Sequence, residues 1–427
     1  MLRRVRTYAR KVFGLDRLAE TRLHDRREEP VIALPHIWLT ALLMYVLNYG
    51  SLHALDQDLK RRHGQGRRKR PAGAPSERTI RRVFAWLDLD ELRTMVKAMV
   101  HVLQRNKIPL TRARSHGLVA AAFDAKEIFA SPVRGCEGCL ERTVRVKDRK
   151  TGQMREQTEY YHRVAVCFVV DCLIPILLDV ELFRPGEGEL SAARRLLKRV
   201  LKDHPRLFDV VTGDALYAEK EFIGMLRRAG KHFVIVLKDD RREICDEADR
   251  LRRHIAPRIW SDGARDCTVW DVEHLWSWWR RPKMDLRVVW SEEKCLRPVQ
   301  GRRLRGQTEP VTSRWVWLTD LTAAECSAKD IWRFGHRRWH IENRCFHEGV
   351  VEWGFDHCFH HTPNAIAAFL LTMGMGMILV HTFLKRNVKD ALRKLYSVLS
   401  LRQQFLRDLG HSLSWSDWAR GRFLNTS

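Results

Sequence analysis

The order of apolar runs from residue 118 onward constrains the fold of this chain more than any other feature. Short apolar runs between polar turns indicate strands at Leu118 to Phe123, Tyr160 to Asp171 and Ile174 to Leu182. Helical and strand patterns then alternate as far as a strand at Phe233 to Leu237. Three consecutive strands followed by alternating helix and strand predict an α/β fold with a mixed sheet.

The regions before and after this sheet follow other patterns. Residues 36–59 and 76–105 carry helical periodicity, and Ser76 is placed to cap the second segment. Helical periodicity returns near Asp330 and continues through Arg338 and Glu342. Alternating apolar and polar residues between 241 and 326 predict a strand-rich insertion. Tryptophan is concentrated in this insertion, and we expect most of these side chains to form its hydrophobic core. They are Trp260, Trp270, Trp276, Trp278, Trp279, Trp290, Trp315 and Trp317.

These patterns divide the 427 residues into four parts, since a chain of this length exceeds one ordinary core. We expect a helical N-terminal DNA-binding domain over 1–115 and a helical basic C-terminal tail over 386–427. The α/β domain would comprise 116–240 and 327–385, interrupted by the insertion at 241–326.

The charge of the chain favours a polyanionic partner. Lys and Arg number 77 against 52 acidic residues, and the net charge of +25 is spread along the sequence. Nucleic acid is the polyanion we expect, although an anionic membrane or plain solubility would also fit such a charge. Lys60 to Arg70 holds seven basic residues in eleven, and a short basic helix follows from Ser76. A solvated loop would have this composition too, but mobile cations suit phosphate contact. The predicted DNA-binding residues are Arg67, Arg68, Lys69, Arg70, Arg78, Arg81 and Arg82.

Sorting signals and a membrane span are not expected. The first twenty residues interleave charged with apolar positions, which argues against a signal peptide, and the ten scattered cysteines suit reduced thiols. Ala365 to Val380 is apolar over about sixteen residues, whereas a span needs roughly 20. We interpret this stretch as a buried helix and expect no membrane partner.

Three acidic residues stand where a phosphodiester-cutting site could use them. Such a site needs hard oxygen ligands for two divalent cations roughly 3.5–4 Å apart. Asp124 and Asp214 each follow an apolar strand, and Glu342 lies on a helix. A lone acid at a strand end is usually a turn former or a cap, so position alone makes a weak constellation.

Three sequence motifs strengthen the case for these acidic residues. They are Val210 to Tyr217 (VVTGDALY), Phe233 to Lys238 (FVIVLK) and Arg337 to Asn343 (RRWHIEN). In order and spacing they resemble bacterial insertion-sequence transposases of the insertion-sequence-four type, over about residues 118–385. The resemblance implies an RNase H-like catalytic domain with an Asp, Asp, Glu triad and a strand-rich insertion before the Glu.

Carried over by position, the resemblance makes Asp124, Asp214 and Glu342 ligands of Mg²⁺ or Mn²⁺ in a two-metal site. It makes Arg338 the arginine four residues before the glutamate. On a helix this spacing places Arg338 and Glu342 on one face, where the guanidinium can reach a phosphate or simply pair with the glutamate. We expect the phosphate contact, and we count Arg338 with the triad in the catalytic site.

Two positions depart from the family signature. Gly335 stands where the family commonly has a tyrosine, and Gly349 stands where it has a lysine. The side chains through which the family would hold DNA at these two positions are therefore missing. Phe334, His336 and Lys126 are the residues that could compensate.

Other polar clusters are weaker candidates. Cys136 and Cys139 have the spacing of zinc ligands, but without a second such pair a closed site would have to recruit distant cysteines or histidines. His357 to His361 could bind a soft metal, although packed or surface polar residues are the simpler interpretation. Glu187 and Glu189 precede a helix and suit a structural role there. None of these is included in the predicted site.

The sequence thus predicts a DNA transposase that cleaves and joins strands at insertion-sequence ends by cut-and-paste transposition. Two alternatives are an RNase H-like nuclease that stops after hydrolysis and a catalytically silent DNA-binding regulator; the intact triad argues against the second. The expected partners are terminal inverted repeats and target DNA, with the chain acting as a homodimer on DNA. The expected location is the bacterial cytoplasm, in association with the nucleoid.

Overall fold

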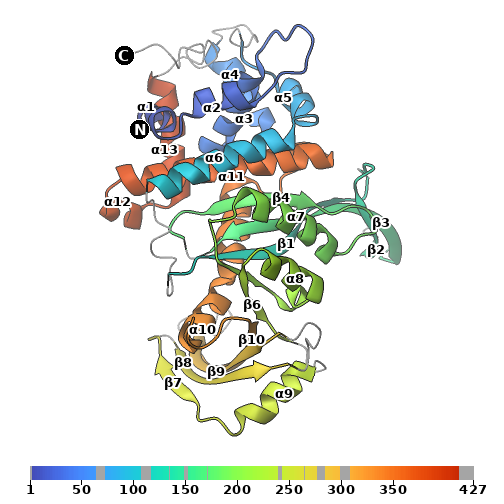
Figure 1. Ribbon diagram of the computed structural model, residues 1–427. Helices are drawn as coiled ribbons and strands as arrows, with labels where there is room; N and C mark the ends of the chain where they lie inside the picture. The colour runs from blue at the N-terminus through green and yellow to red at the C-terminus, as the bar shows by residue number, and fades with distance from the viewer. Residues whose placement is uncertain are drawn as a thin grey trace.

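The computed structural model describes residues 2–63, 73–106, 117–133, 135–148, 152–170, 172–238, 243–263, 265–276, 284–298 and 308–412. Three layers follow one another along the molecule (Figure 1). Helices from both chain ends form one end, strands β1, β3 and β4 with helices α7 and α8 lie in the middle, and strands β7 to β10 with helix α9 form the other end.

The helical layer begins with the first hundred residues. Its elements are α1 (Leu2–Tyr8), a π-helical turn η1 (Ala9–Phe13), α2 (Leu15–Arg22), α3 (Leu34–Val46), α4 (Leu52–His63), α5 (Glu77–Phe84) and α6 (Leu89–Arg105). The predicted helical character of residues 36–59 and 76–105 is confirmed, and each of these segments is divided into two helices. The first breaks at Asn48, whose φ of 59° lies in the left-handed region. Ser76 caps α5 as predicted, accepting a 3.0 Å hydrogen bond from the Thr79 amide.

Helix α11 (Pro363–Asn387) joins the helical layer to the sheet. It contacts α3, α6 and strand β4, and the Phe369 ring stacks on Phe84 with centroids 4.2 Å apart. The buried helix predicted over Ala365 to Val380 is confirmed, because every residue in that stretch is buried. Among the described residues α11 alone has the length and hydropathy of a membrane span, yet 94% of its most apolar window is buried inside the protein. Its apolar character is therefore explained by packing.

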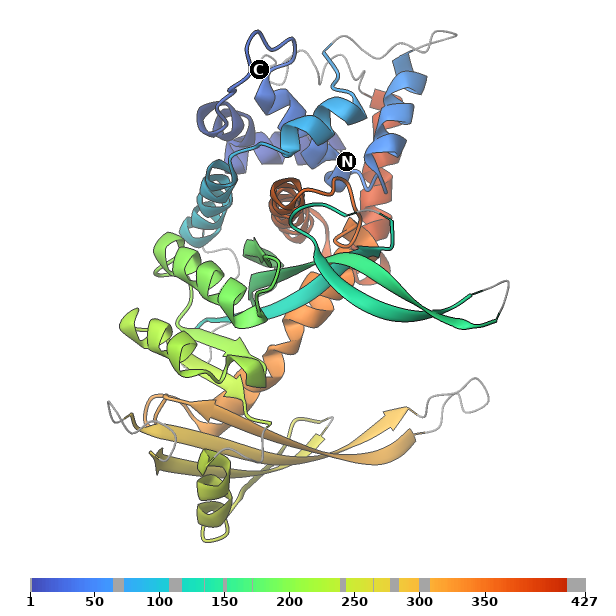
Figure 2. The same ribbon diagram turned by 90° about the vertical axis from the view of Figure 1, so that its right-hand side faces the viewer.

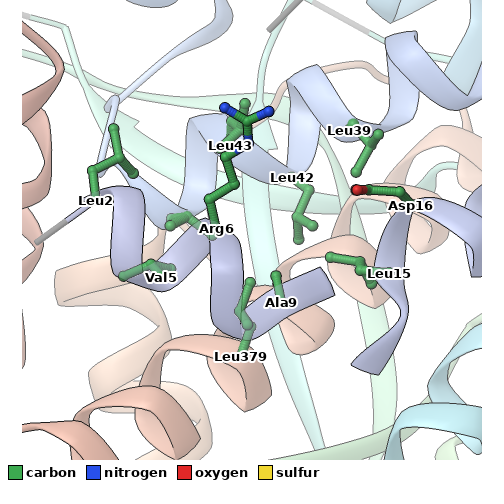
Figure 3. A pocket seen from close by; sticks show the side chains of 11 residues that line it. Leu2, Val5, Arg6, Ala9, Leu15, Asp16, Leu39, Leu42, Leu43 and Leu379 are labelled. Carbon is green, nitrogen blue, oxygen red and sulfur yellow. The ribbon is translucent and has the colours of Figure 1, made fainter. Parts of the chain in front are cut away.

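The packing of α1, α2 and α3 on α11 leaves one small cavity (Figure 3). It measures about 30 Å³ and is lined mainly by leucines, with Leu379 contributed by α11. The carboxyl group of Asp16 lies at its rim, and burial raises the pKa of that group. A cavity of this size has room for a water molecule but not for a nucleotide.

The sheet has ten strands in the described part of the chain. They are β1 (Ala120–Ser131), β2 (Leu140–Lys147), β3 (Met154–Val169), β4 (Ile176–Leu182), β5 (Val210–Gly213), β6 (His232–Val236), β7 (Arg258–Ser261), β8 (Arg265–Leu275), β9 (Leu286–Pro298) and β10 (Thr308–Thr319). The order is β2-β3-β1-β5-β6-β10-β9-β8-β7, with β4 also paired to β3. β1 pairs antiparallel with β3 and parallel with β5, and β5 pairs parallel with β6. The predicted mixed sheet is confirmed.

Strand β2 is an addition to the prediction. With β3 it forms a hairpin that projects far from the rest of the molecule (Figure 2). β1 also continues beyond its apolar residues, so the predicted strand end at Phe123 was wrong. Antiparallel pairing with β3 supports this extension as far as Ser131.

The segment 241–326 begins with helix α9 (Glu243–Arg252) and strand β7, neither of which was predicted individually, and continues as the predicted strands β8 to β10. Its last strand pairs with β6 through Trp317 and Val236, so these strands extend the central sheet. Trp317 is fully buried, whereas Trp276 is 39% exposed. Trp278 and Trp279 lie outside the described residues.

Helices α7 (Glu189–Asp203) and α8 (Lys220–Arg228) cover the middle of the sheet. α10 (Ala328–Arg337) follows the insertion, and the chain then winds as two π-helical segments, η4 (Ile341–His347) and η5 (Gly349–Trp353). α12 (Asp390–Leu395) and α13 (Val398–Ser412) end the described chain. The division into domains remains a prediction, although each predicted part contains elements of the expected kind.

Candidate active site

Asp124 and Asp214 lie on neighbouring parallel strands at the same edge. Ala122 of β1 is in register with Thr212 of β5, and each acid stands two residues further along its strand. Neighbouring strands are about 4.8 Å apart, so this register brings the two carboxyl groups close together. Asp124 lies inside β1 and not at its end, because β1 continues along β3 after its pairing with β5 stops. Asp214 does end its strand, and its Oδ1 accepts a 3.0 Å hydrogen bond from the Leu216 amide.

Glu342 joins these acids from the segment η4, which packs against β1 and β3. The link is Arg338, whose Nη1 lies 3.3 Å from Oδ2 of Asp124 and 3.1 Å from Oε1 of Glu342. The predicted placement of Arg338 and Glu342 on one helical face is confirmed, although Glu342 stands in a π-helical and not an α-helical turn. π-helical turns inside helices are frequent at functional sites.

Burial opposes the ionisation of Asp124. Burial raises its pKa to about 6, and the carboxylates of Glu342 and Asp214 act in the same direction. The Ala125 amide and the positive charge of Arg338 act against them. A carboxyl group with two acidic neighbours is most stable as a carboxylate when further positive charge is present.

The guanidinium of Arg338 has capacity for another ligand. The residue is 5% exposed, and its Nε atom is buried without a hydrogen-bond partner in the described part of the protein. Its Cζ lies 4.5 Å from the ring centroid of Trp339, a side chain that is 37% exposed. Sequence analysis did not select Trp339 as a site residue. Its position directly after Arg338 in the sequence was the feature that could have indicated a place beside this site.

A fourth carboxyl group also lies near the triad. Glu189, in the first turn of α7, accepts hydrogen bonds from Tyr217 at 3.0 Å and from Arg163 at 2.9 Å. Burial raises its pKa, and the charge of Asp214 contributes to the rise. Glu187 instead pairs with Arg195 at 2.6 Å, which agrees with the structural role expected for it. Tyr217 lies three residues after Asp214 in the motif VVTGDALY. This motif therefore contains Asp214 and also positions the carboxyl group of Glu189 through the hydrogen bond from Tyr217.

Packing accounts for both departures from the family signature. A Cβ atom at Gly335 would lie 2.0 Å from Nε1 of Trp317, and one at Gly349 would lie 3.1 Å from the Phe355 ring. The first distance excludes a side chain, and the second is tighter than ordinary contact. A tyrosine at position 335 is therefore incompatible with the buried Trp317.

The three residues considered as substitutes differ in their surroundings. Phe334 is fully buried, and His336 is held 2.7 Å from the Glu293 carboxylate. Lys126 lies two residues beyond Asp124 on β1, so both side chains share one face of the strand. Its Nζ lies 5.7 Å from the centroid of the Phe346 ring. Of the three, Lys126 is the cation placed beside the carboxylates.

The predicted DNA-binding residues that the structure describes belong to α5. Arg78 and Arg82 are exposed. Arg81 instead pairs with Glu77 at 2.7 Å and donates to the backbone oxygen of Phe359. Arg67, Arg68, Lys69 and Arg70 lie outside the described residues. Arg81 therefore has a structural role that Arg78 and Arg82 do not share.

Comparison with known proteins adds a family. No curated protein matches this chain. A solved structure, "Cryo-EM structure of piggyBac transposase synaptic complex with hairpin DNA", is similar at 13% identity and a TM-score of 0.39, covering 97% of this chain and 78% of that chain. Residues 130–379 match the family model described as "Transposase DDE domain", a span that includes Asp214 and Glu342 and begins after Asp124. Domains of this family act in DNA transposition and use divalent metal ions. Since the match covers more than half of the sequence, the chain belongs to the transposase DDE domain family.

Proposed function

We propose that this protein is an insertion-sequence transposase of the insertion-sequence-four type that cleaves and joins DNA by cut-and-paste transposition. The observation that carries the proposal is the meeting of three carboxylates, two of which contact one buried arginine. Asp124 and Asp214 come from adjacent strands, and Glu342 shares the Arg338 guanidinium with Asp124.

The three carboxylates fit a divalent-metal site. They are hard oxygen donors, and they crowd together beside the Arg338 guanidinium. Asp124, Asp214 and Glu342 would hold Mg²⁺ or Mn²⁺. When bound, the metal supplies Lewis acidity to the scissile phosphate and lowers the pKa of the attacking water or hydroxyl group.

The neighbouring residues of the chain would position the DNA. Arg338 has an unpartnered Nε on the same guanidinium that contacts the carboxylates, so it could donate to a phosphate oxygen beside them. Lys126 would add positive charge on the same face of β1. Trp339, partly exposed next to Arg338, could support a base by stacking.

The remaining features support the same assignment. The strand order β4-β3-β1-β5-β6, with an antiparallel half followed by parallel strands, supports the proposal of an RNase H-like catalytic domain. Arg78 and Arg82 present exposed positive charge on α5, which suits phosphate contact. We further propose that the protein works as a homodimer on terminal inverted repeats, within the bacterial cytoplasm.

The test uses the genomic DNA that flanks the reading frame as substrate. Labelled duplexes from both flanks are incubated with the full-length protein, a target plasmid and Mg²⁺. We expect strand cleavage that leaves a 3′ hydroxyl and then joining of that end to the plasmid. Asp124→Asn, Asp214→Asn and Glu342→Gln should each abolish both products, whereas Asp203→Asn, on α7, should leave them unchanged.

The outcomes separate the alternatives. Cleavage without joining would support a nuclease in place of a transposase. DNA binding without metal-dependent cleavage by the parent protein would support a regulator. Normal cleavage by any one of the three variants would remove that residue from the site.

A further inference from the structure

Four soft metal ligands converge at a second place, away from the carboxylates. Cys136 and Cys139 belong to the turn between β1 and β2, His162 lies in β3, and His361 stands just before α11. One ligand atom from each lies within 4.8 Å of all the others. Three segments that are distant in sequence thus meet at one point.

The spacing of these atoms is that of a tetrahedral zinc site. With Zn–S near 2.3 Å and Zn–N near 2.0–2.1 Å, a tetrahedron requires sulfur atoms about 3.8 Å apart and sulfur–nitrogen distances of about 3.5 Å. The Sγ atoms of Cys136 and Cys139 are 3.7 Å apart. Nε2 of His162 lies 3.5 and 3.4 Å from these two sulfurs. The ring nitrogens of His361 lie farther out, at 3.9 and 4.0 Å from the Cys139 sulfur, so this imidazole would move inward slightly to bind the ion.

We propose that Cys136, Cys139, His162 and His361 bind one structural zinc ion that fastens the base of the β2–β3 hairpin to the start of helix α11. Two thiolates and two neutral imidazoles balance the charge of Zn²⁺. His162 is fully buried, Cys139 is 5% exposed, and Cys136 and His361 are half-buried, so protein covers most of the site, as suits a structural ion.

The surroundings support the same assignment. A Cβ atom at Gly138, inside the Cys136–Cys139 turn, would lie 2.3 Å from Cγ of Pro363, so only glycine lets this turn reach α11. The Phe129 ring lies against both imidazoles, with centroids 5.5 Å from His162 and 5.2 Å from His361. The backbone amide of Cys136 points at the Cys139 sulfur from 3.3 Å, as a donor to a thiolate would.

Two other states of the same atoms are a disulfide and a set of thiol hydrogen bonds. A disulfide needs an S–S distance of about 2.05 Å, far below the 3.7 Å observed. Thiol hydrogen bonds are compatible with part of the cluster, since Cys136 Sγ lies 3.2 Å from the His361 carbonyl oxygen. They would not require a second imidazole to face the Cys139 sulfur, whereas zinc does.

Metal content is the first test, and it does not depend on DNA cleavage. The full-length protein, purified without chelator or polyhistidine tag, should contain about one zinc per chain by mass spectrometry of the metal. Cys136→Ser and Cys139→Ser should lose it, while Cys295→Ser, at a similarly half-buried cysteine in β9, should retain it. Less than a tenth of an equivalent in the parent protein, also after incubation with zinc sulfate under reducing conditions and dialysis, would overturn the proposal.

A second measurement covers variants that fail to fold. Cobalt(II) added to the unmodified, zinc-free protein should give the intense visible bands of tetrahedral cobalt with thiolate ligands. A weak octahedral spectrum would contradict the site. His361→Cys should keep the metal and shift the thiolate bands, because a third sulfur replaces a nitrogen. Cys358→Ser, three residues earlier, should bind zinc normally; loss of zinc there would overturn the assignment of His361.

Discussion

The carboxylate site and the cysteine–histidine cluster use the same strands for opposite purposes. Asp124 lies on β1, and His162 lies on β3, which is paired to it. The side chains of Asp124 and Glu342 are 17% and 37% exposed, whereas His162 and Cys139 are buried and Cys136 and His361 are half-buried. Hard oxygen ligands open to solvent suit a metal that must meet a substrate, and soft ligands enclosed by protein suit a metal that holds segments together. We therefore expect the first site to control the reaction and the second to control stability.

The largest expected effect is on the reaction. Asp214→Asn should lower the rate of metal-dependent strand cleavage by about a thousandfold or more, since one metal ligand loses its charge. The free energy of unfolding should change by less than about 0.5 kcal/mol, because asparagine can still accept the hydrogen bond from Leu216. Cleavage kinetics and urea unfolding measure the two quantities. A large loss of stability would show that this site, too, holds the fold.

The converse effect is expected at the cluster. Cys139→Ser should lower the free energy of unfolding by on the order of 3 kcal/mol, the scale at which loss of a cross-link weakens a fold. Cleavage per folded molecule should stay within about twofold of the parent at a temperature where both are folded. Cys295→Ser serves as the control in both assays. A loss of cleavage with unchanged stability would mean that the cluster takes part in the reaction. The division between a reactive site and a stabilising site would then be wrong.

A smaller effect on the reaction is expected at the arginine between the carboxylates. Arg338→Lys keeps the charge but loses the forked guanidinium, so cleavage should fall by about tenfold to a hundredfold with little change in stability. The matched control is Arg333→Lys on the same helix, where the arginine pairs with Asp330 at 2.9 Å. Normal cleavage by Arg338→Lys would mean that Arg338 only forms an ion pair with the carboxylates and does not contact phosphate.

The smallest expected effect concerns the packing behind the carboxylate site. Gly335→Ala should cost about 1–3 kcal/mol of unfolding free energy, because its Cβ would overlap Trp317. Gly349→Ala should cost less, since the Phe355 ring is 3.1 Å away and has room to shift. Denaturant unfolding of both variants measures the difference. Equal stability of Gly335→Ala and the parent would mean that Trp317 can shift at little cost to make room for the added methyl group.

Sequence patterns predicted local elements well and long-range pairings poorly. The apolar runs predicted β3, β4, β5 and β6, and the alternation predicted β8, β9 and β10. Strand β2 was missed because half of its residues, Leu140 to Lys147, are charged and because it projects from the body of the protein. Asp124 was placed at a strand end because the apolar run stops there, while pairing with β3 carries the strand onward. The joining of β10 to β6 had no local signal.

The candidate sites show the same limit. Asp214 and Glu342 were selected because family motifs surround them, and Asp124 was selected because it follows an apolar run at the position that the resemblance gives to the first Asp. The fold brings the three together. His162 had no such signal, because a single histidine in a strand gains meaning only beside the Cys136–Cys139 turn and His361. The π-helical turn at Glu342 likewise has no recognised pattern in sequence.

The contact between Gly335 and Trp317 has a consequence for the evolution of this chain. The two positions belong to α10 and β10, and the absent side chain of one makes room for the indole of the other. Substitution at either position alone is therefore costly, and exchange of both together is the accessible route. In an alignment of relatives the two positions should covary, with a residue smaller than tryptophan at 317 wherever a tyrosine occupies 335. A lineage that acquired the tryptophan first would have been committed to glycine from then on.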